Sequence, residues 1–165
     1  MIDYREIKNL AVKQQTSERN VIREYLQSLF LKWFYEEEKS DNFLFKGGTA
    51  LKIAFQSPRF SEDLDFSGLK NGKNYEKILL AVMEQIENEG IDYNLEESKE
   101  TSGGWLAILN FEIFGEQISI RNEISFRKKG LEKEDKLISS EIIPPYRLIL
   151  MDTKMIVKEK FQAAL

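Results

Sequence analysis

The segment covering residues 43–66 most constrains what this chain can fold into. It reads FLFKGGTALKIAFQSPRFSEDLDF. Its first residues are aromatic and apolar, which is typical of a buried strand, and the pair Gly47-Gly48 ends that run. Residues 49–56 then carry apolar side chains at helical spacing, and Pro58 stops the helix because proline cannot continue one. We therefore predict a strand, a helix that opens on two glycines, and a returning segment.

Two aspartates, Asp63 and Asp65, alternate with apolar residues in the returning segment. If residues 60–66 form a strand, both carboxylates lie on one face, roughly 6–7 Å apart along the chain. Carboxylates this close repel each other unless a cation lies between them, and oxygen ligands of this kind suit Mg²⁺ or Mn²⁺. Unpaired N–H groups at a helix start without side chains also let an anion approach closely. The alternative, a glycine turn before a strand with two surface aspartates, gives no reason for these parts to occur together.

Composition limits the chemistry that such a site can perform. The 165 residues include no cysteine and no histidine, which excludes disulfides, thiol catalysis, an imidazole base and zinc sites built on these residues. The length and the 42% hydrophobic content predict one globular domain over residues 1–165. The net charge of −4 argues against a uniformly basic surface. We find no signal peptide and no apolar run that could span a membrane, so we expect a cytoplasmic protein.

The periodicity of the whole chain predicts an α/β fold, α+β in the stricter sense, with a small mixed β-sheet flanked by helices. Strands are expected near residues 43–46, 60–66, 105–114 and 117–126, with 91–96 as a further candidate. Helices are expected near residues 17–39, 74–89 and 153–164. Residues 1–15 are interpreted as a short helix or a loose arm, and residues 137–143 as a short extended segment.

The motif KGGTAL, followed after a short gap by RFSEDLDF, resembles the nucleotidyltransferase-type toxins of the AbiEii/AbiGii family. That family belongs to the DNA polymerase β-like nucleotidyltransferase superfamily, whose signature is Gly-Gly or Gly-Ser, a short helix and then Asp-x-Asp. All these parts occur here in order, whereas a lone glycine pair or a lone Asp-x-Asp would be a weak signal. The resemblance covers residues 43–66 well, the rest of the chain to Leu165 loosely, and residues 1–40 only as a generic helix.

The resemblance implies metal-dependent transfer of a nucleotidyl group from an NTP to an acceptor hydroxyl. Asp63 and Asp65 would bind two Mg²⁺ (or Mn²⁺) ions. The superfamily usually places a third carboxylate on a later strand, and Glu123 is the best match here. An ordinary exposed strand residue is an equally good explanation of Glu123, and Glu112 in the preceding strand is the alternative third ligand.

The same resemblance assigns residues to the nucleotide. Gly47, Gly48 and Thr49 would surround the triphosphate at the helix start. Arg59 would neutralise charge on the leaving pyrophosphate. Residues 159–165 resemble a family helix with a Glu-Lys pair, so Lys160 would also contact the phosphates. Other basic residues, in the 127–136 loop and in the last helix, are interpreted as solvated.

The biological role implied by the resemblance is that of a toxin in an abortive-infection or toxin–antitoxin pair, with a separate antitoxin protein as partner. RNA, such as tRNA, is a candidate acceptor. Two other functions stay open: an antibiotic-modifying nucleotidyltransferase, and a non-catalytic module that binds a nucleotide or a protein. Family members usually continue into a helical C-terminal part with an Arg/Lys-Asp-x-x-Asp segment. This chain stops at Leu165, so we expect a minimal form or a fragment.

Overall fold

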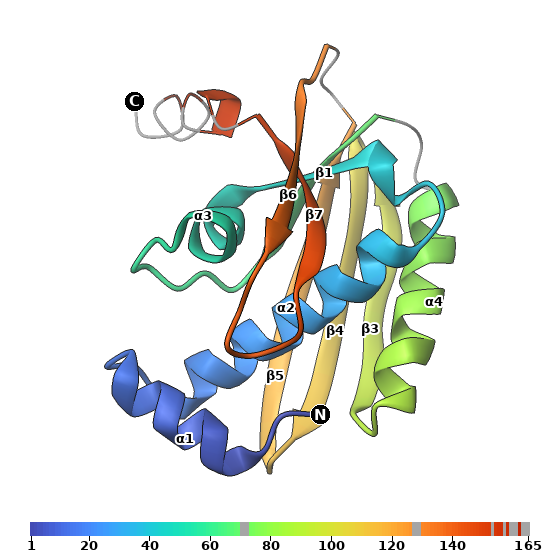
Figure 1. The fold of residues 1–165 in the computed structure, drawn as a ribbon. Helices are drawn as coiled ribbons and strands as arrows, with labels where there is room; N and C mark the ends of the chain where they lie inside the picture. Colours follow the sequence, from blue (N-terminus) through green and yellow to red (C-terminus); the bar gives the residue numbers. More distant parts are fainter. Residues whose placement is uncertain (70–72, 127–129, 153, 157, 159–161, 163–165) are drawn as a thin grey trace.

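The computed structural model describes residues 1–69, 73–126, 130–152, 154–156, 158 and 162. Over these residues, seven strands form one sheet in the order β3-β4-β5-β2-β1-β7-β6 (Figure 1). The strands are β1 (Phe43–Lys46), β2 (Leu64–Gly68), β3 (Asp92–Thr101), β4 (Gly104–Ile113), β5 (Glu116–Ser125), β6 (Lys133–Ile138) and β7 (Tyr146–Met151). The helices are α1 (Tyr4–Lys13), α2 (Glu18–Glu36), α3 (Gly47–Phe55) and α4 (Lys73–Asn88), with a 3₁₀ turn, η1 (Ser40–Asn42). None of the described helices is long and apolar enough to cross a membrane.

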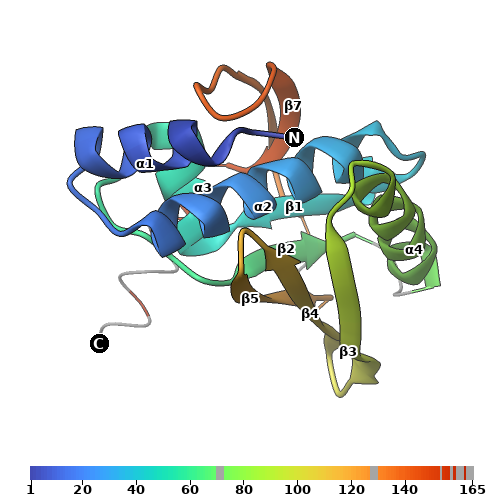
Figure 2. The ribbon, with the colours of Figure 1, turned by 90° about the horizontal axis from the view of Figure 1, so that it is seen from below.

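Helix α2 lies across one face of the sheet, with α1 on its outer side and α4 beside it (Figure 2). Buried side chains occur on several sides of α2, because the helix is enclosed between the sheet and the other two helices. Near its C-terminal end, the ring of Phe34 packs against those of Phe43 on β1, Phe66 on β2 and Tyr75 on α4. These aromatic contacts join the central strands to both helices in one core.

The centre of the sheet is mixed, as predicted. Strand β1 runs antiparallel to β2 and parallel to β7, while β2 runs parallel to β5. Strands β4 and β5 form an antiparallel hairpin. The prediction of an α/β fold with a small mixed sheet flanked by helices is therefore confirmed. The central strands β1, β2 and β5 carry Lys46, Asp65 and Glu123, respectively.

Three predicted boundaries were wrong. The strand expected at residues 60–66 begins only at Leu64, so Asp63 lies in the loop before β2. The helix expected to reach residue 39 ends at Glu36, because Glu37 is already extended, and Lys39 then turns the chain into η1 with a left-handed φ of 69°. Strand β3 continues well beyond residue 96, paired along its length with β4.

Two strands were not predicted. Strand β7 is apolar without alternation because the sheet is covered on both sides of it, and a pattern of period two does not appear in such a strand. Strand β6 forms one edge of the sheet and is mostly charged, which is how exposed edges are kept from pairing with other chains. The extended segment expected at residues 137–143 is only the end of β6 and the loop after it.

The helix predicted at residues 153–164 lies largely outside the described residues. Its start is visible, because the backbone N–H of Lys154 donates to Asp152 Oδ1 at 3.0 Å. This is the N-terminal capping bond expected of an aspartate at that position.

Candidate active site

Three charged residues lie side by side across the central strands. Lys46 on β1 is paired in register with Asp65 on β2, and Asp65 is paired in register with Glu123 on β5. In-register partners project from the same face of a sheet, with strands roughly 4.8 Å apart. The structure therefore brings Asp65 and Glu123 together, and it places Lys46 on the other side of Asp65.

The electrostatics of this row reflect crowded negative charge. The pKa of Asp65 is raised to about 6, chiefly by burial and also by the charges of Asp63 and Glu123, against the opposing effect of Lys46 and Arg121. Burial also raises the pKa of Asp63, with Arg121 lowering it and Glu123 raising it. For Lys46, burial lowers the pKa, and the two neighbouring carboxylates offset part of that change. An added cation would relieve the repulsion among these carboxylates.

The loop that carries Asp63 is attached to two helices. The amide of Gln27 on α2 donates to the carbonyls of Ser61 and Glu62 at 3.0 and 3.1 Å. On the α3 side, Thr49 Oγ1 donates to the carbonyl of Asp63 at 2.5 Å. Thr49 is buried, so its side chain positions Asp63, and only its backbone N–H remains to take part in phosphate binding.

The start of α3 packs directly against Asp65. Gly47 has a φ of +83°, and a Cβ at this position would lie 2.2 Å from Asp65 Oδ2. A Cβ on Gly48 would lie 2.8 Å from Ser61 Oγ. No side chain caps the first turn of this helix. Only glycine therefore allows the helix start and the carboxylate to be this close.

Arg59 lies in the loop between α3 and β2. Together with Gly48, Ser57 and Ser61 it lines a small cavity of about 210 Å³ beside the first turn of α3. The structure therefore brings Arg59 to the same cavity as Gly48. Lys160 lies outside the described residues.

Glu112, the alternative third carboxylate, lies far from the row. The β4 residue opposite Glu123 is Leu106, and Glu112 follows it by six residues, roughly 20 Å along the strand. Glu123 itself forms an ion pair with Arg121 on the same strand. Within the described part of the chain, no three acidic side chains are arranged as a metal centre.

Sequence reasoning missed two residues of this region, Lys46 and Gln27. Lys46 is the polar residue that ends an apolar strand directly before Gly47, which was a usable signal. Gln27 lies within an apolar helical face, where its polar side chain could have indicated a buried contact. In both cases the partner becomes visible only when β1, β2 and α2 are assembled.

Comparisons with known proteins address the family. A protein-family profile described as "Nucleotidyl transferase AbiEii toxin, Type IV TA system" matches residues 29–165. No match was found among curated proteins. Among solved structures, MenT4, the nucleotidyltransferase toxin Rv2826c from Mycobacterium tuberculosis H37Rv, superposes with a TM-score of 0.72 at 19% identity, covering 98% of this chain and 58% of that one.

Two structures from Helicobacter pylori are also similar. JHP933 has a TM-score of 0.63 at 26% identity, and a putative nucleotidyltransferase has a TM-score of 0.59 at 23% identity; each match covers 87% of this chain. The matches cover 56% and 58% of those two chains, so this chain spans less than two thirds of the length of each of the three structures. The profile match includes the glycine pair, both aspartates and Glu123, and on this basis the chain belongs to the AbiEii family of nucleotidyl transferase toxins.

Proposed function

We propose that this chain transfers a nucleotidyl group from an NTP to an acceptor hydroxyl, and that it does so as the toxin of a type IV toxin–antitoxin system. Membership of the AbiEii family supports both parts of the proposal. The neighbouring structure MenT4, itself named a nucleotidyltransferase toxin, supports the fold that this reaction needs. We further propose that residues 1–165 act as a single nucleotidyltransferase-like domain.

The observation that carries the proposal is the contact between the start of α3 and Asp65. A helix start with unpaired N–H groups favours a phosphate, and a carboxylate repels one unless a cation lies between them. Because Gly47 places the two groups in contact, a phosphate bound there requires a cation at Asp65. The arrangement suits a metal-bound triphosphate.

The carboxylates fit a divalent cation by their chemistry and by their place in the sheet. Asp65 and Glu123 are in register and Asp63 precedes β2. Burial is the largest cause of the raised pKa of each aspartate, and the neighbouring carboxylates add to it. Asp63, Asp65 and Glu123 would hold Mg²⁺ or Mn²⁺, with Glu123 turning from Arg121 toward Asp65. When bound, the cations would lower the pKa of the acceptor hydroxyl and neutralise charge on the leaving oxygen.

The residues of the chain would divide the reaction among them. The N–H groups at the start of α3 bind and orient the triphosphate, so that the acceptor oxygen forms a bond to the α-phosphorus while the bond to pyrophosphate breaks. The acceptor's proton passes to one of the carboxylates of the site. Arg59, with Lys160, would neutralise the departing pyrophosphate, and Arg121, once released from its ion pair with Glu123, would face the remaining charge.

A nucleotide titration tests the proposal. ATP, GTP, CTP and UTP are each titrated calorimetrically into the protein with and without Mg²⁺, for the wild type, Asp63→Asn and Asp65→Asn. We expect saturable, Mg²⁺-dependent binding of at least one NTP, lost in both variants, while Glu112→Gln binds as the wild type does. Binding that needs neither Mg²⁺ nor the aspartates would contradict the proposed site.

For the acceptor of the nucleotidyl group, we propose RNA, such as tRNA. Radiolabelled NTP is incubated with the protein and either total tRNA or an aminoglycoside. Label appearing in RNA supports the proposal, and label appearing only in the drug identifies an antibiotic-modifying enzyme instead. Co-expression with a cognate antitoxin would then be expected to restore growth that the active protein arrests.

A further inference from the structure

A second cavity lies behind the helix that opens the proposed nucleotide site. Its volume is about 360 Å³, within the range of small-ligand sites. It is bounded by residues from the end of α1, from α2, from the second half of α3 and from the segment that joins β6 to β7. Neither the glycine pair nor Asp63, Asp65 and Glu123 lines it.

The walls of this cavity carry buried polar atoms without hydrogen-bond partners. These are Gln14 Oε1, Glu24 Oε2 and Tyr146 Oη. Tyr146 is only 4% exposed. Burial raises the pKa of its hydroxyl and the neighbouring Ser28 offsets part of this, yet the hydroxyl has no well-formed hydrogen bond. Buried polar groups in folded proteins almost always form hydrogen bonds, so three groups around one cavity that lack them, Glu24 having only a long ion pair, favour a bound partner there.

The charges around the cavity indicate what that partner carries. Lys52 Nζ lies 3.8 Å from Glu24 Oε2, too far for a hydrogen bond, and is also held over the ring of Phe60 at 4.2 Å. The side chains of this ion pair are mostly buried, with exposed fractions of 15% for Glu24 and 16% for Lys52. Two of the three unpaired atoms, on Gln14 and Glu24, accept hydrogen bonds only. A bound partner would therefore donate to these two atoms, and a positive charge on it would face Glu24 at closer range than Lys52 does.

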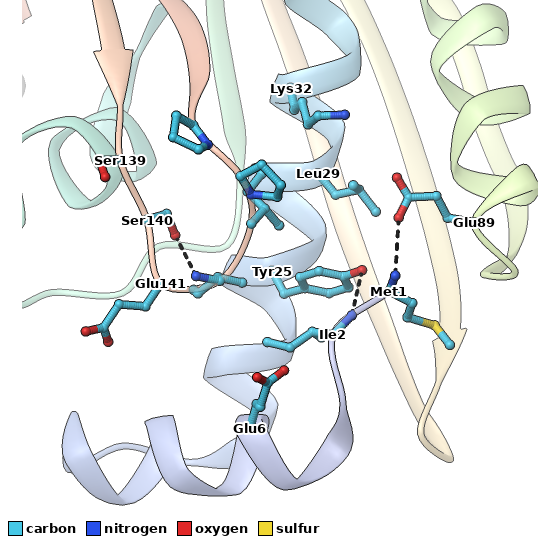
Figure 3. Close-up of a pocket in the computed structure, with 14 residues that line it drawn as sticks. Met1, Ile2, Glu6, Tyr25, Leu29, Lys32, Glu89, Ser139, Ser140 and Glu141 are labelled. Atoms are coloured by element: carbon cyan, nitrogen blue, oxygen red, sulfur yellow. Dashed lines mark hydrogen bonds and ion pairs between the residues drawn. The ribbon is translucent and has the colours of Figure 1, made fainter.

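A larger cavity, of about 610 Å³, makes a useful comparison (Figure 3). There the hydroxyl of Tyr25 accepts from the N–H of Ile2, Ser140 Oγ accepts from the N–H of Ile142, and Glu89 pairs with the amino group of Met1. None of the described residues that line it has an unpaired buried side-chain atom. Of these two cavities, only the smaller one has buried side-chain atoms without hydrogen bonds among its described lining residues.

We propose that the smaller cavity binds a small primary amine that also carries a hydroxyl group, with its ammonium donating to Glu24 and Gln14 and its hydroxyl bonding to Tyr146. This site is separate from the nucleotide site, and the proposal does not depend on nucleotidyl transfer. The ammonium would replace the long, weak approach of Lys52 as the direct partner of Glu24.

The test uses ethanolamine as the probe, with the purified 165-residue protein at pH 7.5. Ethanolamine hydrochloride is titrated calorimetrically and, in parallel, added to thermal unfolding experiments. We expect saturable 1:1 binding and a rise in Tm. Tetramethylammonium chloride, which is cationic but cannot donate hydrogen bonds, should give neither. Glu24→Gln should weaken ethanolamine binding at least tenfold, whereas Glu112→Gln, on β4 and not among the residues that line the cavity, should leave it unchanged.

Tyr146→Phe separates a ligand site from a merely structural tyrosine. Because the hydroxyl lacks a partner in the free protein, the variant should keep or raise the Tm of the ligand-free protein and still bind ethanolamine more weakly. The proposal is overturned if ethanolamine gives no saturable heat, if Tyr146→Phe or Glu24→Gln binds as tightly as the wild type, or if K⁺ competes as well as ethanolamine, since a bare cation would then be the ligand.

Discussion

Asp65 lies between a cation, Lys46, and an anion, Glu123, and its surroundings shift its pKa strongly. Its pKa is raised from 3.8 to about 6, and burial is the largest cause. The native state therefore disfavours the charged form relative to the unfolded chain. A group of this kind contributes its full stabilisation below its pKa in the unfolded chain. That contribution is lost as the pH rises through its pKa in the folded protein.

Asp65→Asn should therefore stabilise the protein above pH 6 when neither metal nor nucleotide is present. We expect equal unfolding free energies for variant and wild type near pH 4, and an advantage for the variant near pH 7.5 of at most about 3 kcal/mol. Urea unfolding across this pH range measures the difference. An advantage that is independent of pH would show that the charge of Asp65 is not its cause.

Gly47 is constrained twice, by its positive φ and by the carboxylate beside it. Gly47→Ala brings a Cβ to 2.2 Å from Asp65 Oδ2 and to 3.0 Å from Asp65 Cβ, so rotation of the carboxylate alone cannot remove the clash. Gly115 has a similar φ of +75° with nothing within 4 Å of the added Cβ, and Gly115→Ala is therefore the matched control. We expect Gly47→Ala to lose about 1–3 kcal/mol more than Gly115→Ala in urea unfolding.

A double-mutant cycle identifies the contact responsible. In an Asp65→Ala background the carboxylate is gone and only the 3.0 Å contact with Cβ remains, so the cost of Gly47→Ala should fall most of the way toward that of Gly115→Ala. An unchanged cost would place the strain in the backbone at Gly47 rather than in its contact with Asp65.

At the scale of elements, α2 does more than cover the sheet. Gln27, which is 3% exposed, donates to two carbonyls of the loop that carries Asp63, and Arg23 pairs with Glu62 of the same loop at 3.0 Å. One helix face thus positions a loop that belongs to the proposed catalytic site. Helix α3 holds the same loop from the other side through Thr49.

Gln27→Met keeps the volume of the side chain and removes both hydrogen bonds. The carbonyls of Ser61 and Glu62 lose their donor, so we expect a loss of about 1–3 kcal/mol in urea unfolding. Mg²⁺-dependent NTP binding should weaken as well, because Asp63 is no longer held. Gln85→Met on α4 serves as the control, and nucleotide binding equal to that of the control would mean that α2 does not position the site.

At the scale of the whole molecule, the family match begins inside a helix that the core needs. The match starts at residue 29, yet α2 has side chains before that point that are at most 1% exposed: Val21, Ile22, Tyr25 and Leu26. Burying side chains of this size stabilises a protein by about 1.5–3 kcal/mol each, against a typical total stability of about 5–15 kcal/mol.

A chain that begins at residue 29 should therefore not fold cooperatively. A chain that begins at residue 16 lacks only α1, and we expect it to fold with reduced stability. Circular dichroism and urea unfolding of both variants, beside residues 1–165, check this. A cooperative transition at the wild-type midpoint for the shorter variant would show that the family-matched part is an independent unit.

The sequence by itself determined the local elements of the central region and its family. The apolar run, the glycine pair, the helical spacing and the alternation of residues 104–125 are local patterns, and local patterns report how each segment folds and which side it buries. The same patterns predicted the fold class, and the motif at residues 43–66 carried the family resemblance that the profile match confirms.

Only the tertiary structure decided which charged residues meet. The row of Lys46, Asp65 and Glu123 depends on the register of three strands. Two of them, β2 and β5, are neighbours in the sheet but are separated in the sequence by α4 and the β3–β4 hairpin. Strand β7 and the contacts of Gln27 also depend on the tertiary structure, and each was missed for its own reason. Burial on both faces of a strand removes its alternation, and a hydrogen bond between distant segments leaves no trace in the residues around either partner.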